Sequence, residues 1–274
     1  MRINVRHQTD YKYGRPARSA LQLLRLTPRS HEGQFVRRWR VEVDADARLD
    51  KSEDAYGNIT HLIFVEGPVA SVRILIEGEV DTTDTGGYVK GSVERQPPRL
   101  FLRGTALTQP SAQLQAFSRD IIAAGGGDVL TSLHRITAEL HRVMSFRVGA
   151  TSTTTTAEQA FNAKAGVCQD FAHIFVTAAH VLGVPARYVG GYYLRTDTID
   201  QDAGHAWAEA YLEGLGWIGF DPANGACVTD RYVRVAVGSD YLEAAPVRGA
   251  QVGGTDEALS VAIQIQQGRA IAQD

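Results

Sequence analysis

Apolar and polar residues alternate with a period of two through much of the first eighty residues of this chain. The runs 35–43 and 72–80 show the alternation most clearly. Because successive side chains of a strand point to opposite faces, this pattern predicts strands with one buried face. Gly57 and Asn58, which tolerate positive φ, favour a turn between the two runs. The first part of the chain is therefore predicted to be an antiparallel β domain.

The period changes near residue 100. A Gly-Gly pair at 86–87 and a Pro-Pro pair at 97–98 interrupt regular structure, because proline lacks an N–H donor and restricts the residue before it. Ser111 is a candidate N-cap for a helix that extends to Ile122. The next apolar residues are spaced for one face of a second helix: Leu130, Leu133, Ile136, Leu140 and Val143.

Strand patterns return after the helical region, first in 205–212 and 217–221 and then in the tail. Helices followed by antiparallel strands are typical of the α+β class. We expect a β-rich N-terminal domain over residues 1–100 and a core of helices packed on an antiparallel sheet over 101–230. Residues 231–274 are expected to form strands that return to the N-terminal sheet.

Composition excludes several classes of protein. A net charge of −3 over 274 residues provides no excess of basic groups for nucleic acid. No apolar run is long enough to cross a bilayer, and the alternating, polar start is unlike a secretory signal. We therefore expect a cytoplasmic protein that binds neither nucleic acid nor membrane and acts on a peptide or another amide-containing substrate. The sequence leaves the oligomeric state unassigned.

Cys168 follows Gly166 and Val167 and opens an apolar, helix-like run. A cysteine in water has a pKa near 8.5, so only a small fraction is thiolate at neutral pH. The free N–H groups of a helix N-terminus favour the thiolate and can also hold a developing oxyanion. A position at the start of this helix would therefore serve two steps of an acyl transfer.

An attacking thiol also needs an imidazole nearby. His173 and His180 are rotated away from Cys168 on its own helix, by about 140° and 120°. His205 opens a predicted strand instead, and a turn over 213–216 would bring Asp221 back beside it. A carboxylate in that place can fix the tautomer of the ring and stabilise its charged form.

These segments together resemble the bacterial transglutaminase-like superfamily, whose core is a papain-like cysteine fold. The resemblance covers roughly residues 150–225 and rests on Gly-Val-Cys-Gln-Asp-Phe-Ala-His at 166–173, Gly-Val-Pro-Ala-Arg-Tyr-Val at 183–189, Gly-His-Ala-Trp at 204–207 and Phe-Asp-Pro at 220–222. The β-rich first hundred residues resemble the N-terminal domain that often accompanies this core in bacteria.

The resemblance implies a catalytic triad of Cys168, His205 and Asp221 that acts through a thioester acyl-enzyme, with the N–H of Cys168 at the oxyanion site. Water as the acceptor gives a peptidase or amidase, which is the activity we expect. An amine as the acceptor would give a transamidase, and a peptide-binding module without catalysis is a further alternative. Acetyl transfer from coenzyme A is a distant one, because in the arylamine acetyltransferases the cysteine lies much nearer the N-terminus.

No cofactor and no metal are expected. Asp197, Asp200 and Asp202 lack the glycine and distal glutamate of a calcium loop. His134 and His141 are too far apart along a helix to act as adjacent zinc ligands. Cys227 has no partner motif and is interpreted as structural, although the sequence leaves a disulfide with Cys168 open. Asp170 is assigned a structural role in the first turn of the helix.

Overall fold

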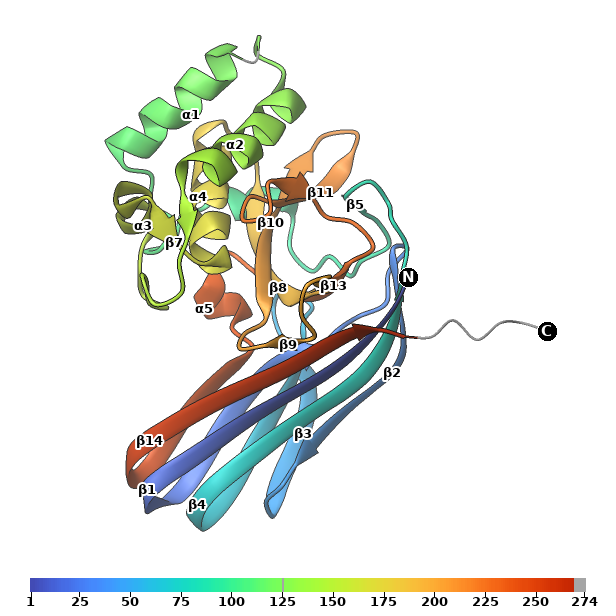
Figure 1. Ribbon diagram of the computed structural model, residues 1–274, viewed down its shortest axis with the longest axis vertical. Helices are drawn as coiled ribbons and strands as arrows, with labels where there is room; N and C mark the ends of the chain where they lie inside the picture. Colours follow the sequence, from blue (N-terminus) through green and yellow to red (C-terminus); the bar gives the residue numbers. More distant parts are fainter. Residues whose placement is uncertain (125, 269–274) are drawn as a thin grey trace, which may run out of the picture.

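Two antiparallel sheets, one above the other in Figure 1, organise the computed structural model, which describes residues 1–124 and 126–268. The lower sheet has the order β2-β4-β1-β14-β9, with β3 paired to β4, and the upper has the order β12-β11-β10-β8-β13, with β5 paired to β11. The lower strands are β1 (Arg2–Thr27), β2 (Gln34–Val43), β3 (Ala47–Glu53), β4 (Ile59–Thr82), β9 (Asp200–Gln201) and β14 (Val247–Gln267). The upper strands are β5 (Tyr88–Val89), β8 (Ala186–Tyr193), β10 (His205–Leu212), β11 (Gly216–Asp221), β12 (Ala226–Cys227) and β13 (Tyr232–Gly238).

The helices lie on one side of the upper sheet (Figure 1). They are α1 (Ala112–Ala124), α2 (Val129–Val143), α3 (Ala157–Ala163), α4 (Cys168–Val181) and the short α5 (Tyr241–Ala244), with a 3-10 turn at Pro98–Leu102 and a two-stranded parallel pair of β6 (Ser145–Phe146) and β7 (Ala165–Gly166). The predicted α+β class, an antiparallel β domain followed by helices packed on an antiparallel sheet, is confirmed.

The lower sheet folds over on itself. Its long strands β1, β4 and β14 run down one side of the unit and return behind it (Figure 1). Glycines allow the turn, since a Cβ on Gly67 would lie 2.4 Å from the carbonyl oxygen of Ala17, and Gly254 has a φ of +81°. The two layers enclose apolar side chains such as Tyr13, Leu24 and Ile74. A two-layered β unit results, with its own core.

α4 is the central helix of the upper unit. Its apolar residues pack among α1, α2, α3 and one face of the upper sheet, and Phe171, Ile174 and Phe175 are all buried. Ala208 and Ala210 of β10 face the helix, so their small side chains let it approach the sheet closely. This packing fixes the N-terminus of α4 relative to the start of β10.

The boundaries between the units differ from the sequence expectation. β14 pairs with β1 in the lower sheet, but β13 pairs with β8 in the upper sheet, so the tail from residue 231 is shared between the two. β5 pairs with β11, which places residues 88–89 in the upper unit although the expected boundary was residue 100. Periodicity predicts strands in the tail but not β5, and it does not identify the partners of the strands that it predicts. Residues 269–274 of the tail lie outside the described part of the chain.

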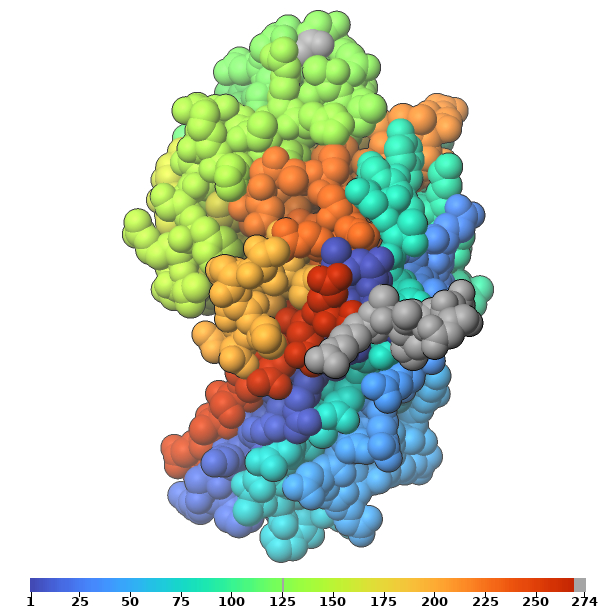
Figure 2. Space-filling view, turned by 45° about the vertical axis from the view of Figure 1, so that its right-hand side comes forward, coloured from blue at the N-terminus to red at the C-terminus, as the bar shows by residue number. Residues whose placement is uncertain are grey.

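The two units share a continuous apolar junction, in which Val5 and Ile263 of the lower sheet meet Tyr192 and Val235 of the upper one. β9, from the loop just before His205, pairs with β14. Figure 2 shows the red end of β14 lying against this gold-to-orange loop. The returning C-terminal strand therefore holds the segment that leads into β10.

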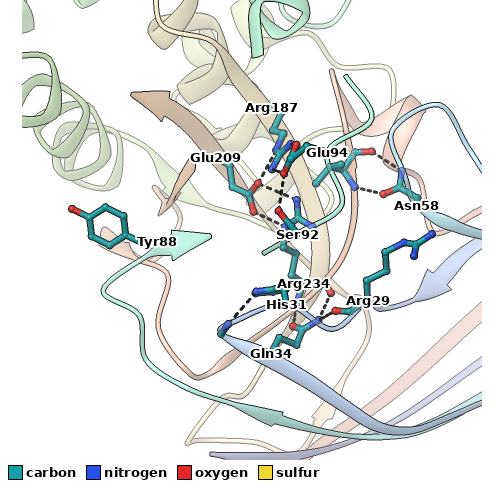
Figure 3. Close-up of polar contacts among 12 residues, drawn as sticks. Arg29, His31, Gln34, Asn58, Tyr88, Ser92, Glu94, Arg187, Glu209 and Arg234 are labelled. Atoms are coloured by element: carbon teal, nitrogen blue, oxygen red, sulfur yellow. Dashed lines mark hydrogen bonds and ion pairs between the residues drawn. The ribbon is translucent and has the colours of Figure 1, made fainter. Parts of the chain in front are cut away.

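A cluster of buried charges joins the units on the side of the upper sheet away from α4. Glu209 accepts bonds of 2.7 Å from both Arg187 and Arg234, and Arg187 also pairs with Glu94 at 2.6 Å (Figure 3). Gln34 of the lower sheet bonds the backbone of Arg234 in both directions. Because each buried charge has an opposite partner, the cluster can exist in the interior.

Among the described residues, no helix is both long and apolar enough to span a membrane.

Candidate active site

Cys168 is the first residue of α4, and its side chain is half-buried. Asp170, in the same first turn of the helix, accepts a hydrogen bond of 2.8 Å from the N–H of Val167 and one of 2.6 Å from the hydroxyl of Thr151. A side chain on Gly166 would collide with Asp170, so glycine is required there. Since the first N–H groups of a helix lack intrahelical acceptors, Cys168 stands where backbone donors are free.

His205 reaches the site from a separate element, the first residue of β10. Its Nε2 lies 2.6 Å from Oδ2 of Asp221, the last residue of β11. The two strands form the hairpin that the turn residues predict, with Ala208 opposite Phe220. The structure thus brings together Cys168, His205 and Asp221, the three residues that the sequence selects.

Asp221 is fully buried and held by several donors. Its Oδ2 accepts bonds from the Asn224 side chain at 2.7 Å and the Tyr232 hydroxyl at 2.8 Å, in addition to the His205 ring. Its Oδ1 accepts the backbone N–H groups of Ala223 and Asn224. Asn224 and Tyr232 were not among the residues predicted from the sequence. The turn after Asp-Pro was a signal for Asn224, whereas Tyr232 comes from a distant strand.

The electrostatics of the site favour a charged imidazole. Burial disfavours the charged ring, but the hydrogen bond and charge of Asp221, together with the Cys168 thiol, raise the pKa of His205 to about 10. Burial works against the Asp221 carboxylate, yet the His205 ring and the Tyr232 and Asn224 donors hold its pKa below the ordinary value. A thiol beside an imidazolium is stabilised as the thiolate.

Aromatic side chains enclose the imidazole. The ring centroid of Tyr193 lies 5.3 Å from that of His205, and the rings of Trp207 and Tyr232 lie at 6.3 Å and 5.9 Å. Gly191 makes room for this packing, because a Cβ there would lie 2.8 Å from the Trp207 ring. The shell limits the access of water to the His205–Asp221 pair, which strengthens their interaction.

The other candidate residues lie elsewhere. His173 is fully buried and accepts the N–H of Tyr241 at 3.0 Å, and His180 bonds the carbonyl oxygen of Ala186. Cys168 and Cys227 are both free, so the disulfide that the sequence leaves open is not formed. Cys227 contacts His134 at 3.8 Å, and burial raises the pKa of its thiol. Within residues 1–124 and 126–268, no group of three or more metal-ligating side chains gathers.

A cavity of about 310 Å³ opens beside the thiol and the imidazole. Cys168, Gln169 and His205 line one side of it, and strands β1 and β14 of the lower sheet line the other. A substrate bound there would contact both units of the molecule. The lower sheet is therefore part of the site as well as of the scaffold.

Two family models match the sequence, each over one of these units. The first describes the transglutaminase-like superfamily and matches residues 115–222. The second describes the bacterial transglutaminase-like N-terminal region and matches residues 3–81. The matched core contains Cys168, His205 and Asp221.

Individual proteins that are similar to this chain support its fold but do not indicate an activity. A crystal structure of a proposed cysteine protease from Cytophaga hutchinsonii superposes with a TM-score of 0.77 at 19% identity, covering 100% of this chain and 92% of the other. At that identity the likeness concerns the fold alone. Uncharacterized proteins of Mycobacterium leprae and Mycobacterium tuberculosis are 28% and 29% identical, over 96% and 90% of this chain and 98% and 87% of their own lengths.

Proposed function

Since the chain joins a bacterial transglutaminase-like N-terminal region to a core of the transglutaminase-like superfamily, we propose that it is a cysteine-dependent amide hydrolase. One observation carries the proposal. A thiol at a helix N-terminus and an imidazole bound at 2.6 Å to a fully buried carboxylate line the same cavity. We assign Cys168 as the nucleophile, His205 as the general acid and base, and Asp221 as the residue that orients the ring.

The proposed reaction has two halves. The Cys168 thiolate attacks the amide carbonyl, and the N–H of Cys168 binds the oxyanion that develops. The C–N bond then breaks as His205 gives its proton to the leaving amine, which leaves a thioester. Neutral His205 next takes a proton from water, which attacks the thioester. The acid departs, and the proton on His205 restores the thiolate–imidazolium pair.

Intact mass spectrometry of a peptide library tests this reaction. The library contains glutamine side chains and isopeptide bonds and is incubated with and without an added alkylamine. Hydrolysis adds the mass of water to the products, whereas transamidation adds the amine. We expect water to be added in both conditions by the unsubstituted protein and by Cys227→Ala, and in neither condition by Cys168→Ser.

The two cysteines provide a matched pair of variants. Cys168→Ala abolishes turnover in the proposed reaction, while Cys227→Ala leaves it unchanged because that thiol lies outside the cavity lining. Equal turnover by Cys168→Ala would refute the proposal. Products that gain only the amine would make the protein a transamidase. Rapid, Cys168-selective alkylation without turnover of any library member would favour a peptide-binding module.

We also propose that the protein is located in the cytoplasm. Both cysteines are free thiols, a state that a reducing compartment maintains. Cell fractionation with an antibody against the native protein tests this placement, and recovery outside the cytoplasm would refute it.

A further inference from the structure

The lining of the cavity is mainly apolar away from the thiol. Side chains of the lower sheet and α5 supply most of the far wall, among them Tyr11, Leu26, Ala244 and Val261. Such a lining suits the carbon chain of a substrate. It provides few polar contacts, so any charged group in this wall has a large influence on which substrate is accepted.

Arg25 of β1 is the only arginine or lysine among the described residues that line the cavity. His7 also lines it, but its ring bonds Tyr192 and Thr9, and burial lowers its pKa to about 4, so it is neutral at pH 7. Asp202 belongs to the exposed loop before His205. Arg25 therefore places a guanidinium in a wall whose other side chains are mainly apolar.

The hydrogen bonds of Arg25 are incomplete. Its side chain is only 10% exposed, and its Nε donates to Oδ2 of Asp54 at 2.7 Å. Its Nη1 is buried and has no partner among the described residues. Asp54 accepts other hydrogen bonds as well, from the N–H of Tyr56 and from both the N–H and the side-chain amide of Asn58.

A buried guanidinium N–H without an acceptor is costly, and an incoming acceptor removes that cost. A carboxylate is the group that arginine binds best, because its two oxygens match the guanidinium fork and carry the opposite charge. We infer that the cavity accepts an amide substrate that also carries a carboxylate, separated from the scissile bond by an apolar spacer, and that Arg25 binds this carboxylate. The inference rests on the proposed function and names its substrate class.

Binding to Cys168→Ala protein tests the inference without any turnover. The probes are N-butyl monoamides of succinic, glutaric and adipic acid, each compared with the matching diamide, in which a carboxamide replaces the carboxylate. N-acetyl ω-amino acids and their carboxamides form a second series, with the charge on the amine side of the scissile bond. Titration calorimetry gives the dissociation constants.

We expect the best carboxylate probe of either series to bind at least about tenfold more tightly than its carboxamide partner. When Arg25→Gln is added, the dissociation constants of the acid and its carboxamide should agree to within about twofold. Arg6→Gln, which removes another arginine of β1 that does not line the cavity, leaves the preference intact. Equal binding of acid and amide in both series, or a preference that survives Arg25→Gln, overturns the inference.

The comparison of acid with amide in an otherwise unaltered cavity remains decisive if Arg25→Gln does not fold. Turnover by the unsubstituted protein separates the two proposals. Cys168-dependent hydrolysis without any carboxylate preference refutes the role of Arg25 alone. A carboxylate preference in binding without hydrolysis of any probe or library member refutes the proposed activity and leaves the carboxylate site standing.

Discussion

At the scale of single residues, the charge of His205 depends on the Asp221 carboxylate, whose position is fixed by hydrogen bonds to both of its oxygens. Asp221 has no exposed surface and receives hydrogen bonds on both oxygens, so it cannot turn away from the ring. An aspartate held in this way fixes the orientation of the imidazole and supplies the negative charge that keeps the ring protonated. The reactivity of Cys168 should therefore respond to changes that never touch the sulfur.

Asp221→Asn tests this dependence. The raised pKa of His205, about 10, means that the ring is charged from acidic pH up to that value and supports the thiolate throughout. Asparagine removes the charge, so the pKa of the ring falls and the ring supports the Cys168 thiolate less. We expect iodoacetamide alkylation at pH 6, measured in a Cys227→Ala background, to slow by at least about tenfold.

The alkylation rate of the same variant should rise with pH across the neutral range, because the imidazolium that supports the thiolate is lost there. Asp120→Asn, on α1 and away from the cavity, serves as the control. An unaltered profile for Asp221→Asn would show that the thiolate does not depend on the ion pair.

Tyr232→Phe tests the hydrogen bond that the Tyr232 hydroxyl donates to Asp221. The variant removes one donor to Oδ2 and keeps the ring that packs against Tyr193 and Trp207. Because the other donors remain, we expect a loss of roughly three- to tenfold in kcat and in alkylation at pH 6. KM should stay constant, since Tyr232 does not line the cavity. Tyr211→Phe, at the far end of β10, should change neither quantity.

The residue types of the site could be read from the sequence, because the helix start and the hairpin are local features. Cys168 follows a glycine that the helix start requires, and the turn at 213–216 brings Asp221 back to His205. Tyr232 could not be predicted, since it belongs to a strand whose partner sheet the periodicity leaves undecided. Arg25 was missed for the same reason, as it lies more than 140 residues before Cys168 in the sequence.

At the scale of elements, the first turn of α4 is held by Asp170. Its Oδ2 is the common acceptor for the Val167 N–H and the Thr151 hydroxyl, and it ties the loop over 151–156 to the cysteine. Burial raises the pKa of this carboxyl, and the two hydrogen bonds act in the opposite direction. The structural role assigned to Asp170 from the sequence agrees with these contacts.

Asp170→Ala should lower the free energy of unfolding by about 2 kcal/mol, because it leaves two buried or half-buried donors without an acceptor. Alkylation of Cys168 should also slow as the turn loosens. Urea unfolding followed by circular dichroism measures the first effect. Asp170→Asn, which keeps one acceptor oxygen, should recover part of both losses, and Glu158→Ala in the exposed first turn of α3 should cost little. A fully stable Asp170→Ala protein would contradict this account.

The elements themselves were largely predictable, and their pairing was not. The helix expected to begin after Ser111 is α1, and Ser111 accepts the N–H of Leu114 as a cap would. The alternation at 72–80 corresponds to the second part of β4, which is 24 residues long. The fold-over of the lower sheet depends on close approaches such as that of Gly67 to Ala17, fifty residues away in the sequence. Such long-range contacts leave no periodic signal along the chain.

At the scale of the whole molecule, burial keeps two histidines neutral, His7 at the junction between the units and His173 within the upper unit. His7 lies between the lower sheet and Tyr192, and His173 lies between α4 and the backbone of Tyr241. Burial lowers the pKa of His7 to about 4 and that of His173 to about 3. His205 differs from both because Asp221 offsets the cost of its charge.

These shifts predict how stability varies with pH. Between about pH 6.5 and 4 the unfolded chain binds protons at His7 and His173 that the folded protein does not, so acidification favours unfolding by about 1.4 kcal/mol per pH unit for each ring. The pKa of His205 is raised, so this ring affects stability in the alkaline range. Its contribution to the free energy of unfolding is complete below pH 6.5 and is lost as the pH rises towards 10. From these three rings, stability should be greatest near pH 6.5.

Denaturant titrations from pH 4.5 to 9 measure this dependence. His7→Gln keeps a hydrogen-bonding side chain between Tyr192 and Thr9 but cannot titrate. The slope of the free energy of unfolding against pH should therefore decrease, below pH 6.5, by the amount that corresponds to one bound proton. His141→Gln replaces an exposed ring and should leave the slope unchanged. An acid slope that is identical in His7→Gln and the unsubstituted protein would contradict a lowered pKa of His7 in the folded state.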